Sequence, residues 1–246
     1  MPEGHLIHWW ARQHARDLAG RVVRATSPQG RFSVDAAAID GQVLAGVDAY
    51  GKHFFYGFTP LVHVHLGMAG KWFRAAGEPR PSVRLRLAGP DATWDLVAPI
   101  RCELWSIEQR DGLVAELGPD PLRADADPAI AWRRLHASKL PIGAALLEQR
   151  IIAGIGNVIR NELLFELRLD PLTPAASLSR KRFDAFWTRL VDVMRASAAK
   201  GRIVFAPGRA RARSVYKRDA CARCATPIAV STIGGRTAYA CPQCQR

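Results

Sequence analysis

The hydrophobic pattern of the N-terminal half predicts one opening helix followed by short strands. Apolar side chains such as Trp10 and Leu18 recur at helical spacing up to Gly20, where a helix would end. Beyond that glycine, short apolar runs are bounded by turn residues, and Val83–Leu87 alternates as a half-buried strand should. Many short strands at close spacing favour a β-sandwich over βαβ units. We expect strands over residues 21–23, 42–47, 53–58, 61–65, 83–87 and 93–97.

The pattern of the C-terminal half predicts helices instead. Between a Ser179 N-cap and a Gly201 stop, apolar residues recur at spacings of three and four, which indicates one long amphipathic helix. Shorter helices are expected over 128–137, from near Ile142, and up to 170–171. The long helix presents to the core Phe183, Phe186, Trp187, Leu190, Val191 and Met194.

A glycine-rich turn, Ala153-Gly154-Ile155-Gly156-Asn157, separates two of these helices. The glycines permit tight backbone geometry, and Asn157 is placed as the N-cap of the next helix. Unpaired backbone N–H groups at a helix start can receive a phosphate, so Gly156 and Asn157 are candidate phosphate-binding residues. A plain αα-hairpin without a ligand has the same pattern.

Four of the five cysteines form two Cys-x-x-Cys pairs in the last part of the chain: Cys221, Cys224, Cys241 and Cys244. This spacing is typical of a tetrahedral zinc site, and four thiolates leave no open position, so the zinc would be structural. Two disulfides are the alternative, which a reducing cytosol disfavours. The intervening residues read as a β-hairpin with Gly234-Gly235 at its turn. The fifth cysteine, Cys102, is expected to be a small buried hydrophobe.

The composition is that of a globular protein, with 246 residues, 48% of them hydrophobic and 23% charged. We expect an α+β multidomain fold, because a Pro- and Asp-rich stretch separates the strand-rich part from the helical part. The expected divisions are 1–118 (sandwich), 119–127 (linker), 128–210 (helical domain) and 211–246 (zinc hairpin). No run reaches the ~18 apolar residues of a membrane span, and no secretory pattern opens the chain, so a cytosolic protein is expected.

The net charge of +13 indicates a polyanionic partner, because clustered Lys and Arg displace condensed counterions from nucleic acid. Composition alone leaves DNA, RNA and anionic membrane open. Residues 200–218 contain no acid before Asp219 and lead into the cysteine hairpin, which favours phosphate tracking over a solvated linker. The basic residues of this segment are Lys200, Arg202, Arg209, Arg211, Arg213, Lys217 and Arg218.

Four motifs stand in order along the chain: Pro2-Glu3-Gly4, Gly51-Lys52-His53, Ala153 to Asn157, and the cysteine hairpin with Arg236. This ordered set resembles the formamidopyrimidine-DNA glycosylase and endonuclease VIII family over essentially the whole chain. The resemblance implies an N-terminal β-sandwich with flanking helices, a helix–two-turn–helix domain and a zinc-finger hairpin. It also implies a monomeric DNA glycosylase and abasic-site lyase of base excision repair that acts on double-stranded DNA.

The resemblance assigns the catalytic roles. After removal of Met1, Pro2 would carry an α-amino group with a pKa of about 7.7–8.0 that attacks C1′ and forms a Schiff base. Glu3 would be the acid/base, Lys52 the proton donor of β-elimination, and Arg236 the phosphate-binding residue of δ-elimination. Taken without the family, Pro2 and Glu3 are an ordinary helix start, and Arg236 is a solvated charge at a hairpin tip.

The resemblance also implies DNA-binding roles. Asn157, with Gly156, matches the family's phosphate-gripping turn. An extruded base leaves a gap in the duplex, and Met68 in the loop from His65 to Gly70 is the candidate wedge that fills it. A core methionine is the alternative.

Departures from the family pattern indicate which kind of damaged base the protein removes. The region 98–103 lacks the Pro-Arg-Arg-Phe-Gly segment of purine-directed members, and 201–214 lacks their Gly-Gly-Thr-Thr capping loop. Both favour the endonuclease VIII branch and oxidised pyrimidines, and Pro-Glu-Gly-His is most like its actinobacterial members. His5 and Leu6 replace a proline and a glutamate common to both branches. A purine-directed glycosylase, a non-catalytic sensor of damaged DNA and a zinc-ribbon RNA protein stay as alternatives.

Overall fold

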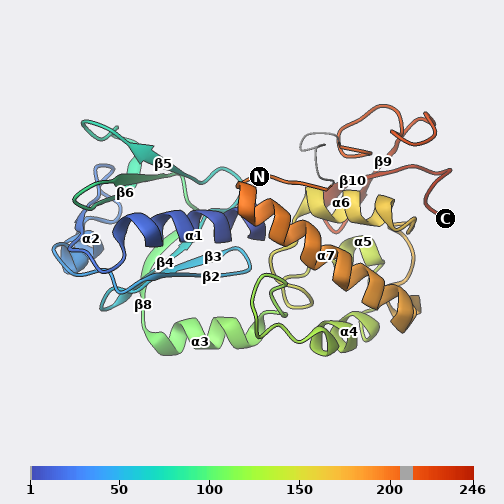
Figure 1. Cartoon of the computed structure of the whole chain (residues 1–246), viewed down its shortest axis with the longest axis horizontal. Coiled ribbons are helices and arrows are strands. Elements are labelled where there is room, and N and C mark those ends of the chain that lie inside the picture. The colour runs from blue at the N-terminus through green and yellow to red at the C-terminus, as the bar shows by residue number, and fades with distance from the viewer. Residues whose placement is uncertain (1, 206–212) are drawn as a thin grey trace. The chain divides into compact units, whose positions relative to one another are not determined.

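The computed structural model describes residues 2–205 and 213–246, and the chain divides into two compact units between Ala115 and Glu116. The N-terminal unit holds the opening helix and most of the strands, and the C-terminal unit holds most of the helices (Figure 1). No helix among the described residues has the length and apolar character needed to cross a membrane.

The N-terminal unit is a β-sandwich of two antiparallel four-stranded sheets. One sheet has the order β1-β6-β7-β5 and the other β2-β3-β4-β8. The core between them contains Phe54, Tyr56 and Leu85, which are fully buried, and helix α1 adds Ile7 and Leu18. The elements are α1 (Gly4–Leu18), β1 (Arg24–Thr26), α2 (Ser33–Ile39), β2 (Val47–Tyr50), β3 (His53–Tyr56), β4 (Leu61–His65), β5 (Lys71–Ala75), β6 (Val83–Ala88), β7 (Thr93–Val97), β8 (Arg101–Trp105) and α3 (Ile107–Glu116). The predicted sandwich is confirmed.

Some strand positions differ from the prediction. The run 21–23 forms only an isolated bridge from Val22 to Val43, and the strand begins at Arg24. Helices α2 and α3 and strands β5 and β8 were not predicted. Strand β8 has only one buried residue, Cys102, and α3 has none, so neither carries a clear apolar pattern.

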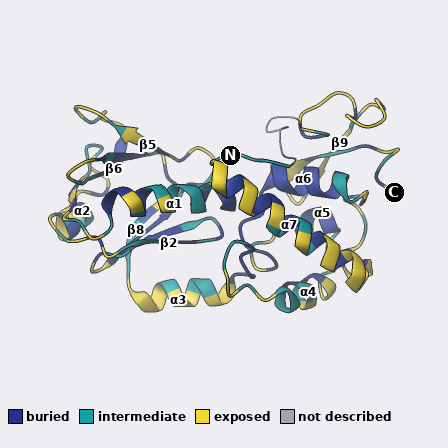
Figure 2. Cartoon of the chain, in the orientation of Figure 1, coloured by how far each residue is buried: buried dark blue, intermediate teal, exposed yellow. Residues whose placement is uncertain are grey.

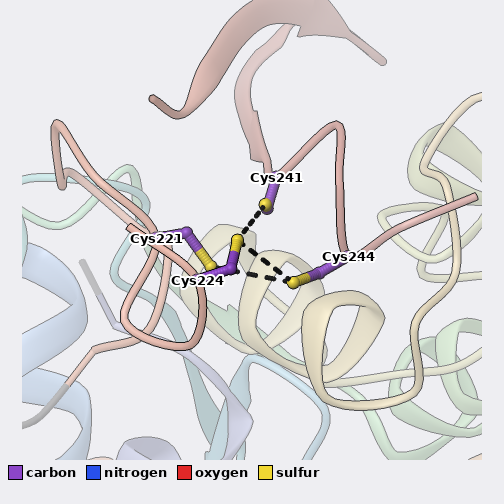
Figure 3. Close-up of side chains that lie close together, drawn as sticks. All are labelled: Cys221, Cys224, Cys241 and Cys244. Atoms are coloured by element: carbon purple, nitrogen blue, oxygen red, sulfur yellow. Dashed lines mark hydrogen bonds between the residues drawn. The ribbon is translucent and has the colours of Figure 1, made fainter. Parts of the chain in front are cut away.

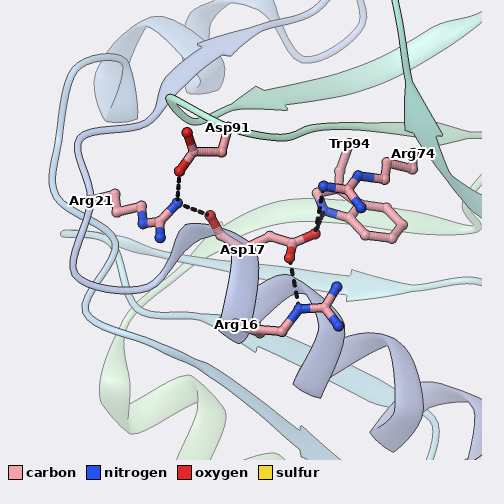
Figure 4. Close-up of polar contacts among 6 residues, drawn as sticks. All are labelled: Arg16, Asp17, Arg21, Arg74, Asp91 and Trp94. Atoms are coloured by element: carbon pink, nitrogen blue, oxygen red, sulfur yellow. Dashed lines mark hydrogen bonds and ion pairs between the residues drawn. The ribbon is translucent and has the colours of Figure 1, made fainter.

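A polar cluster fixes the last turn of α1 against the sheet β1-β6-β7-β5 (Figure 4). Asp17 is 8% exposed and accepts hydrogen bonds from Arg16 Nε at 2.9 Å and Trp94 Nε1 at 3.2 Å. Burial opposes its ionisation, but the hydrogen bond and charge of Arg16 and the charge of Arg74 together lower the pKa of Asp17. Arg21 ties the Asp17 carbonyl to Asp91.

The C-terminal unit packs its helices around a second apolar core. Ser179 accepts a hydrogen bond from the Arg182 N–H at the start of α7, and Gly201 ends that helix at a φ of 61°, as predicted. At the glycine turn the first helical residue is Asn157 and the N-cap is Gly156, one residue earlier than predicted. The elements are α4 (Pro128–His136), α5 (Ile142–Ala145), α6 (Asn157–Glu166), η1 (Ala175–Ser177), α7 (Arg180–Lys200), β9 (Ala229–Ile233) and β10 (Arg236–Ala240).

Helix α6 is buried over most of its length, whereas α3 has no buried residue (Figure 2). The segment after α3 is also packed: residues 117–121 are buried, and a Cβ on Gly118 would meet the Ile151 carbonyl oxygen at 2.3 Å. Only glycine therefore fits at position 118 without a backbone shift. The subdivision of residues 116–246 into linker, helical domain and hairpin stays a prediction.

Candidate functional site

The N-terminal motif lies where α1 begins. Pro2 is half-buried, and Glu3 is fully buried as the N-cap residue. The Glu3 carbonyl accepts from the Leu6 and Ile7 N–H groups, while its carboxylate makes no capping hydrogen bond to the helix. The helix is therefore capped by the Glu3 backbone, and the buried carboxylate stands next in sequence to the Pro2 nitrogen.

Lys52 lies in the two-residue turn that joins β2 to β3. Gly51 has a φ of 57°, a left-handed conformation that favours glycine, and the strands pair directly from Tyr50 to His53. Lys52 is half-buried. The tight turn thus sets the lysine at the end of the sheet, beside the first residue of β3.

Three histidines share one face of the sheet β2-β3-β4-β8, and sequence reasoning assigned none of them a role. His53 pairs with His65 across β3 and β4, and the side chains of His63 and His65 point the same way because they are two residues apart. His53 Nδ1 lies 2.9 Å from His63 Nε2. The alternation His63-Val64-His65 in β4 is the sequence pattern that could have indicated that these two histidines share a face of the sheet.

These imidazoles are held neutral. Burial, then nearby charges that include Lys52, lowers the pKa of His53 to about 2. Burial likewise lowers the pKa of His63 to about 3 and of His65 to about 4. At neutral pH the cations of this region are therefore Lys52 and Arg101, with uncharged rings beside them.

The loop after β4 presents Met68 to solvent. A Cβ on Gly70 would meet the Leu66 carbonyl oxygen at 2.3 Å, so the loop closes as tightly as glycine allows. Met68 is 62% exposed, which does not fit a core methionine. Ile100, 69% exposed, lies against Gly67, where an added Cβ would be 3.1 Å from the Ile100 Cβ.

Asn157 faces the cysteine hairpin. Its Nδ2 donates to the Thr237 carbonyl at 2.9 Å, and the side chain is 6% exposed. One turn further, Asn161 donates to the Asn157 carbonyl and accepts from the Tyr239 N–H at 2.8 Å. Helix α6 is thus hydrogen-bonded along β10.

A buried arginine, which the sequence analysis did not identify, holds the hairpin turn. Arg160 is fully buried and donates to the carbonyls of Gly143 at 3.0 Å, Ile233 at 2.9 Å and Thr237 at 2.9 Å. Ile233 ends β9 just before the two-glycine turn, and Thr237 is the second residue of β10, next to Arg236. The guanidinium therefore ties both strands to α6 close to the hairpin tip.

Glu162 holds the segment before the hairpin, as Arg160 holds the hairpin itself. Its carboxylate accepts from three successive backbone N–H groups, those of Ser214 at 2.7 Å, Val215 at 3.0 Å and Tyr216 at 2.8 Å. A buried anion is well satisfied by such a set of donors. The sequence alone does not show which residues it would meet.

Arg236 begins β10 directly after Gly234 and Gly235, which have φ values of 61° and 66°. It pairs with Ile233 across the turn, and its side chain is exposed. The predicted hairpin and its turn are confirmed, with strands that extend to the turn on both sides.

The four predicted zinc ligands come together (Figure 3). Their sulfurs all lie within 4.8 Å of one another, with Cys224 at 3.5 Å from both Cys241 and Cys244. Tetrahedral thiolates at Zn–S distances near 2.3 Å would be about 3.8 Å apart, so the donor set fits a zinc ion. Hydrogen bonding with Thr226 lowers the pKa of Cys224, whereas burial raises the pKa of Cys241 and of Cys244.

The basic segment leading to the hairpin is anchored at its end. Arg213 and Lys217 are exposed and lie over the Tyr216 ring, at 4.9 and 6.0 Å from its centroid. Arg209 and Arg211, also predicted to track phosphates, lie outside the described residues. Cys102 is 8% exposed in the sandwich core, as predicted.

Comparison with known proteins agrees with this architecture. The formamidopyrimidine-DNA glycosylase N-terminal domain matches residues 1–97, and the formamidopyrimidine-DNA glycosylase H2TH domain matches residues 117–206. Endonuclease 8 1 of Mycobacterium tuberculosis is 42% identical, with all of both chains covered. The formamidopyrimidine-DNA glycosylase of Corynebacterium aurimucosum is 31% identical over 88% of this chain and 84% of its own.

Solved structures of this family have the same fold. The MutM (Fpg) protein of Thermus thermophilus superposes with a TM-score of 0.82 at 26% identity, covering 99% of this chain and 98% of that one. Family models, a relative at 42% identity and the shared fold agree with the four ordered motifs. The chain therefore belongs to the formamidopyrimidine-DNA glycosylase family of DNA repair enzymes.

Proposed function

We propose that this protein is a bifunctional glycosylase and abasic-site lyase that removes oxidised pyrimidines from double-stranded DNA as a monomer. The observation that carries the proposal is the pairing of Pro2 with a fully buried Glu3 at the start of α1. A secondary amine next to a carboxyl group that does not cap the helix supplies both a nucleophile and a proton carrier.

The proposed reaction begins at C1′ of the damaged nucleotide. With Met1 removed, the Pro2 lone pair forms a bond to C1′, the glycosidic bond breaks with its electron pair on the base, and the proton that the Pro2 nitrogen then loses neutralises the departing base. Glu3 delivers a proton to the opening sugar oxygen, which leaves an iminium between Pro2 and C1′. An α-amino pKa of about 7.7–8.0 keeps part of the amine neutral at physiological pH.

Elimination follows from the iminium, which makes the C2′ proton acidic. Glu3, a carboxylate after the first step, accepts that proton while the C3′–O bond breaks with its electron pair on the 3′ phosphate, and Lys52 donates a proton to the leaving phosphate. Arg236 binds the phosphate whose departure completes δ-elimination. Lys52 lies in a two-residue turn between paired strands and Arg236 directly follows one, which limits the movement of both cations.

DNA binding is assigned to the helical turn, the hairpin and the wedge loop. Gly156 and Asn157 contact a phosphate, and Met68 enters the gap left by the extruded base. A zinc ion on the four cysteines gives the hairpin a rigid base and takes no part in the chemistry.

The choice of pyrimidines rests on the absence of the Pro-Arg-Arg-Phe-Gly segment and on likeness to the Endonuclease 8 proteins of Mycobacterium. Removal of oxidised purines is the second candidate, supported by the relatives named as formamidopyrimidine-DNA glycosylases. Cleavage of duplexes with thymine glycol, dihydrouracil or 8-oxoguanine, compared side by side, decides between them.

Borohydride trapping tests the mechanism. Protein shown by mass spectrometry to begin at Pro2 should form a covalent adduct with duplex DNA that contains an abasic site. Pro2→Gly should reduce trapping at least tenfold while DNA affinity stays within about twofold, because only the nucleophile changes. Failure of the wild-type protein to form an adduct would leave the non-catalytic binding protein as the better description. Unchanged trapping by Pro2→Gly, with the adduct located by peptide mapping on a lysine and not on the new N-terminal residue, would identify that lysine as the nucleophile.

A further inference from the structure

The sheet β2-β3-β4-β8 has a face lined by rings that leads from its interior to the Lys52 turn. In the row next to that turn, β3 contributes His53, β4 contributes His65 and β8 contributes Arg101. The row behind it contains His63, and Trp105 stands one row further. The His63 ring stacks on Trp105 with centroids 3.8 Å apart.

His63 has a single hydrogen-bond partner available to it in the described part of the chain. It is fully buried, its Nε2 lies 2.9 Å from His53 Nδ1, and its own Nδ1 has no partner among the described residues. A neutral imidazole carries one N–H, so the pair has two possible arrangements. Either His63 donates to His53 or His53 donates to His63.

The burial of His63 chooses between these arrangements. If His53 donated, the proton of neutral His63 would sit on Nδ1, a buried N–H with no acceptor, which is a costly defect. If His63 donates from Nε2, its Nδ1 keeps only a lone pair there. The second arrangement leaves His53 with an unprotonated Nδ1, so the proton of His53 must be on Nε2.

The charges near His53 keep this arrangement neutral. The Lys52 ammonium and the Arg101 guanidinium both disfavour a charge on His53, and burial disfavours it more strongly. His53 is half-buried and follows Lys52 directly. The ring thus offers one uncharged N–H donor beside a cation, a combination suited to a phosphate oxygen.

We propose that His63 is a positioning residue that holds His53 as its neutral Nε2–H form, so that His53 donates to a phosphate oxygen of the DNA strand beside Lys52. The proposal rests on the proposed function, which places the cut strand at Lys52. A metal between the two rings is excluded by their 2.9 Å contact, which leaves no room for an ion.

Substitutions of His63 separate this role from simple packing. Gln places an amide N–H close to the position of the His Nε2–H, whereas Phe keeps the stack on Trp105 but has no donor. We expect His63→Phe to weaken binding to duplex DNA with a stable abasic-site analogue about tenfold, as for loss of one hydrogen bond to a charged group, and His63→Gln to stay within about threefold. A packing role predicts the reverse order and would overturn the proposal.

A double substitution tests whether both histidines act through one contact. His53→Phe should also cost about tenfold, and His53→Phe with His63→Phe should cost no more than either alone. Additive losses would contradict a shared pathway. The exposed His136→Gln is the control, expected to bind as the wild type.

The tautomeric states of His53 and His63 can be measured in the absence of DNA. Long-range proton–nitrogen correlation spectra of histidine-labelled protein should show a protonated Nε2 on both His53 and His63, with the His63 signal altered in His53→Phe. A proton on His63 Nδ1 would refute the inference even if the protein traps abasic DNA. Conversely, a wild-type protein with the expected tautomers and no trapped adduct would refute the proposed function alone.

Discussion

The sandwich and the cysteine hairpin are both made of antiparallel strands, but they are stabilised in different ways. The sandwich buries a large apolar cluster that includes Phe54, Tyr56 and Leu85. The hairpin region has only small clusters, such as Phe165 and Val215 with two of the cysteines. An element that cannot bury enough apolar surface needs other cross-links.

In the hairpin region those cross-links are a four-thiolate site and buried polar groups from α6. Arg160 donates to two carbonyls of the hairpin and one of α5, and Glu162 accepts from three N–H groups of the segment before the hairpin. Hydrophobic periodicity can therefore locate the sandwich, whereas the hairpin depends on polar contacts made at long sequence separation.

Removal of the metal should give the largest effect. Structural zinc sites contribute roughly 10–16 kcal/mol of apparent binding free energy, so chelation should disorder residues around the four cysteines. Hydrogen exchange should rise in β9 and β10 while the strands of the sandwich keep their protection. Metal analysis should give one zinc ion per chain, with Cys102→Ala as a control that keeps it. Protected hairpin amides after complete metal loss would show that α6 alone suffices.

Removal of the Arg160 side chain should have the next largest effect on the hairpin. Arg160→Met removes the arginine donor from three carbonyls, of which that of Thr237 keeps Asn157 Nδ2 as a partner, and each buried group left unsatisfied costs about 1–3 kcal/mol. We expect faster exchange at Ile233 and Thr237 with zinc content unchanged. The exposed Arg195→Met on α7 is the matched control. Equal exchange in both variants would mean that the thiolate site alone holds the hairpin.

Lowering the pH should reduce the stability of the sandwich, and this effect should be smaller than the effects of removing zinc or Arg160. Burial, opposed by the Asp17 charge, lowers the pKa of His14 to about 3 from 6.5, so its contribution to stability is complete above pH 6.5 and is lost as the pH falls toward 3. Between pH 6.5 and 5 this amounts to about 2 kcal/mol. Urea unfolding followed through exchange of β3 and β6 amides should show this slope, and His14→Gln should reduce it by about one proton. An unchanged slope would assign the proton uptake to other histidines.

The motifs that identify the family were readable in the sequence because each depends on neighbours in the chain. The Cys-x-x-Cys pairs, the Gly-Gly turn before Arg236 and the cap at Ser179 follow local rules of spacing and backbone geometry. The ends of the strands in the sandwich were less accurate. Strand β8 could be identified only from its pairing with β4 in the structure, because its own residues show no clear hydrophobic pattern.

The classes of element, the four-cysteine site and the family could all be read from the chain alone, since local periodicity and ligand spacing survive without a partner segment. Which polar side chains are buried, and which groups they meet, came from the folded structure. Arg160 reaches carbonyls of Ile233 and Thr237, more than seventy residues away, and His63 meets His53 across two strands. Such contacts depend on register and burial, which the folded chain sets through long-range packing.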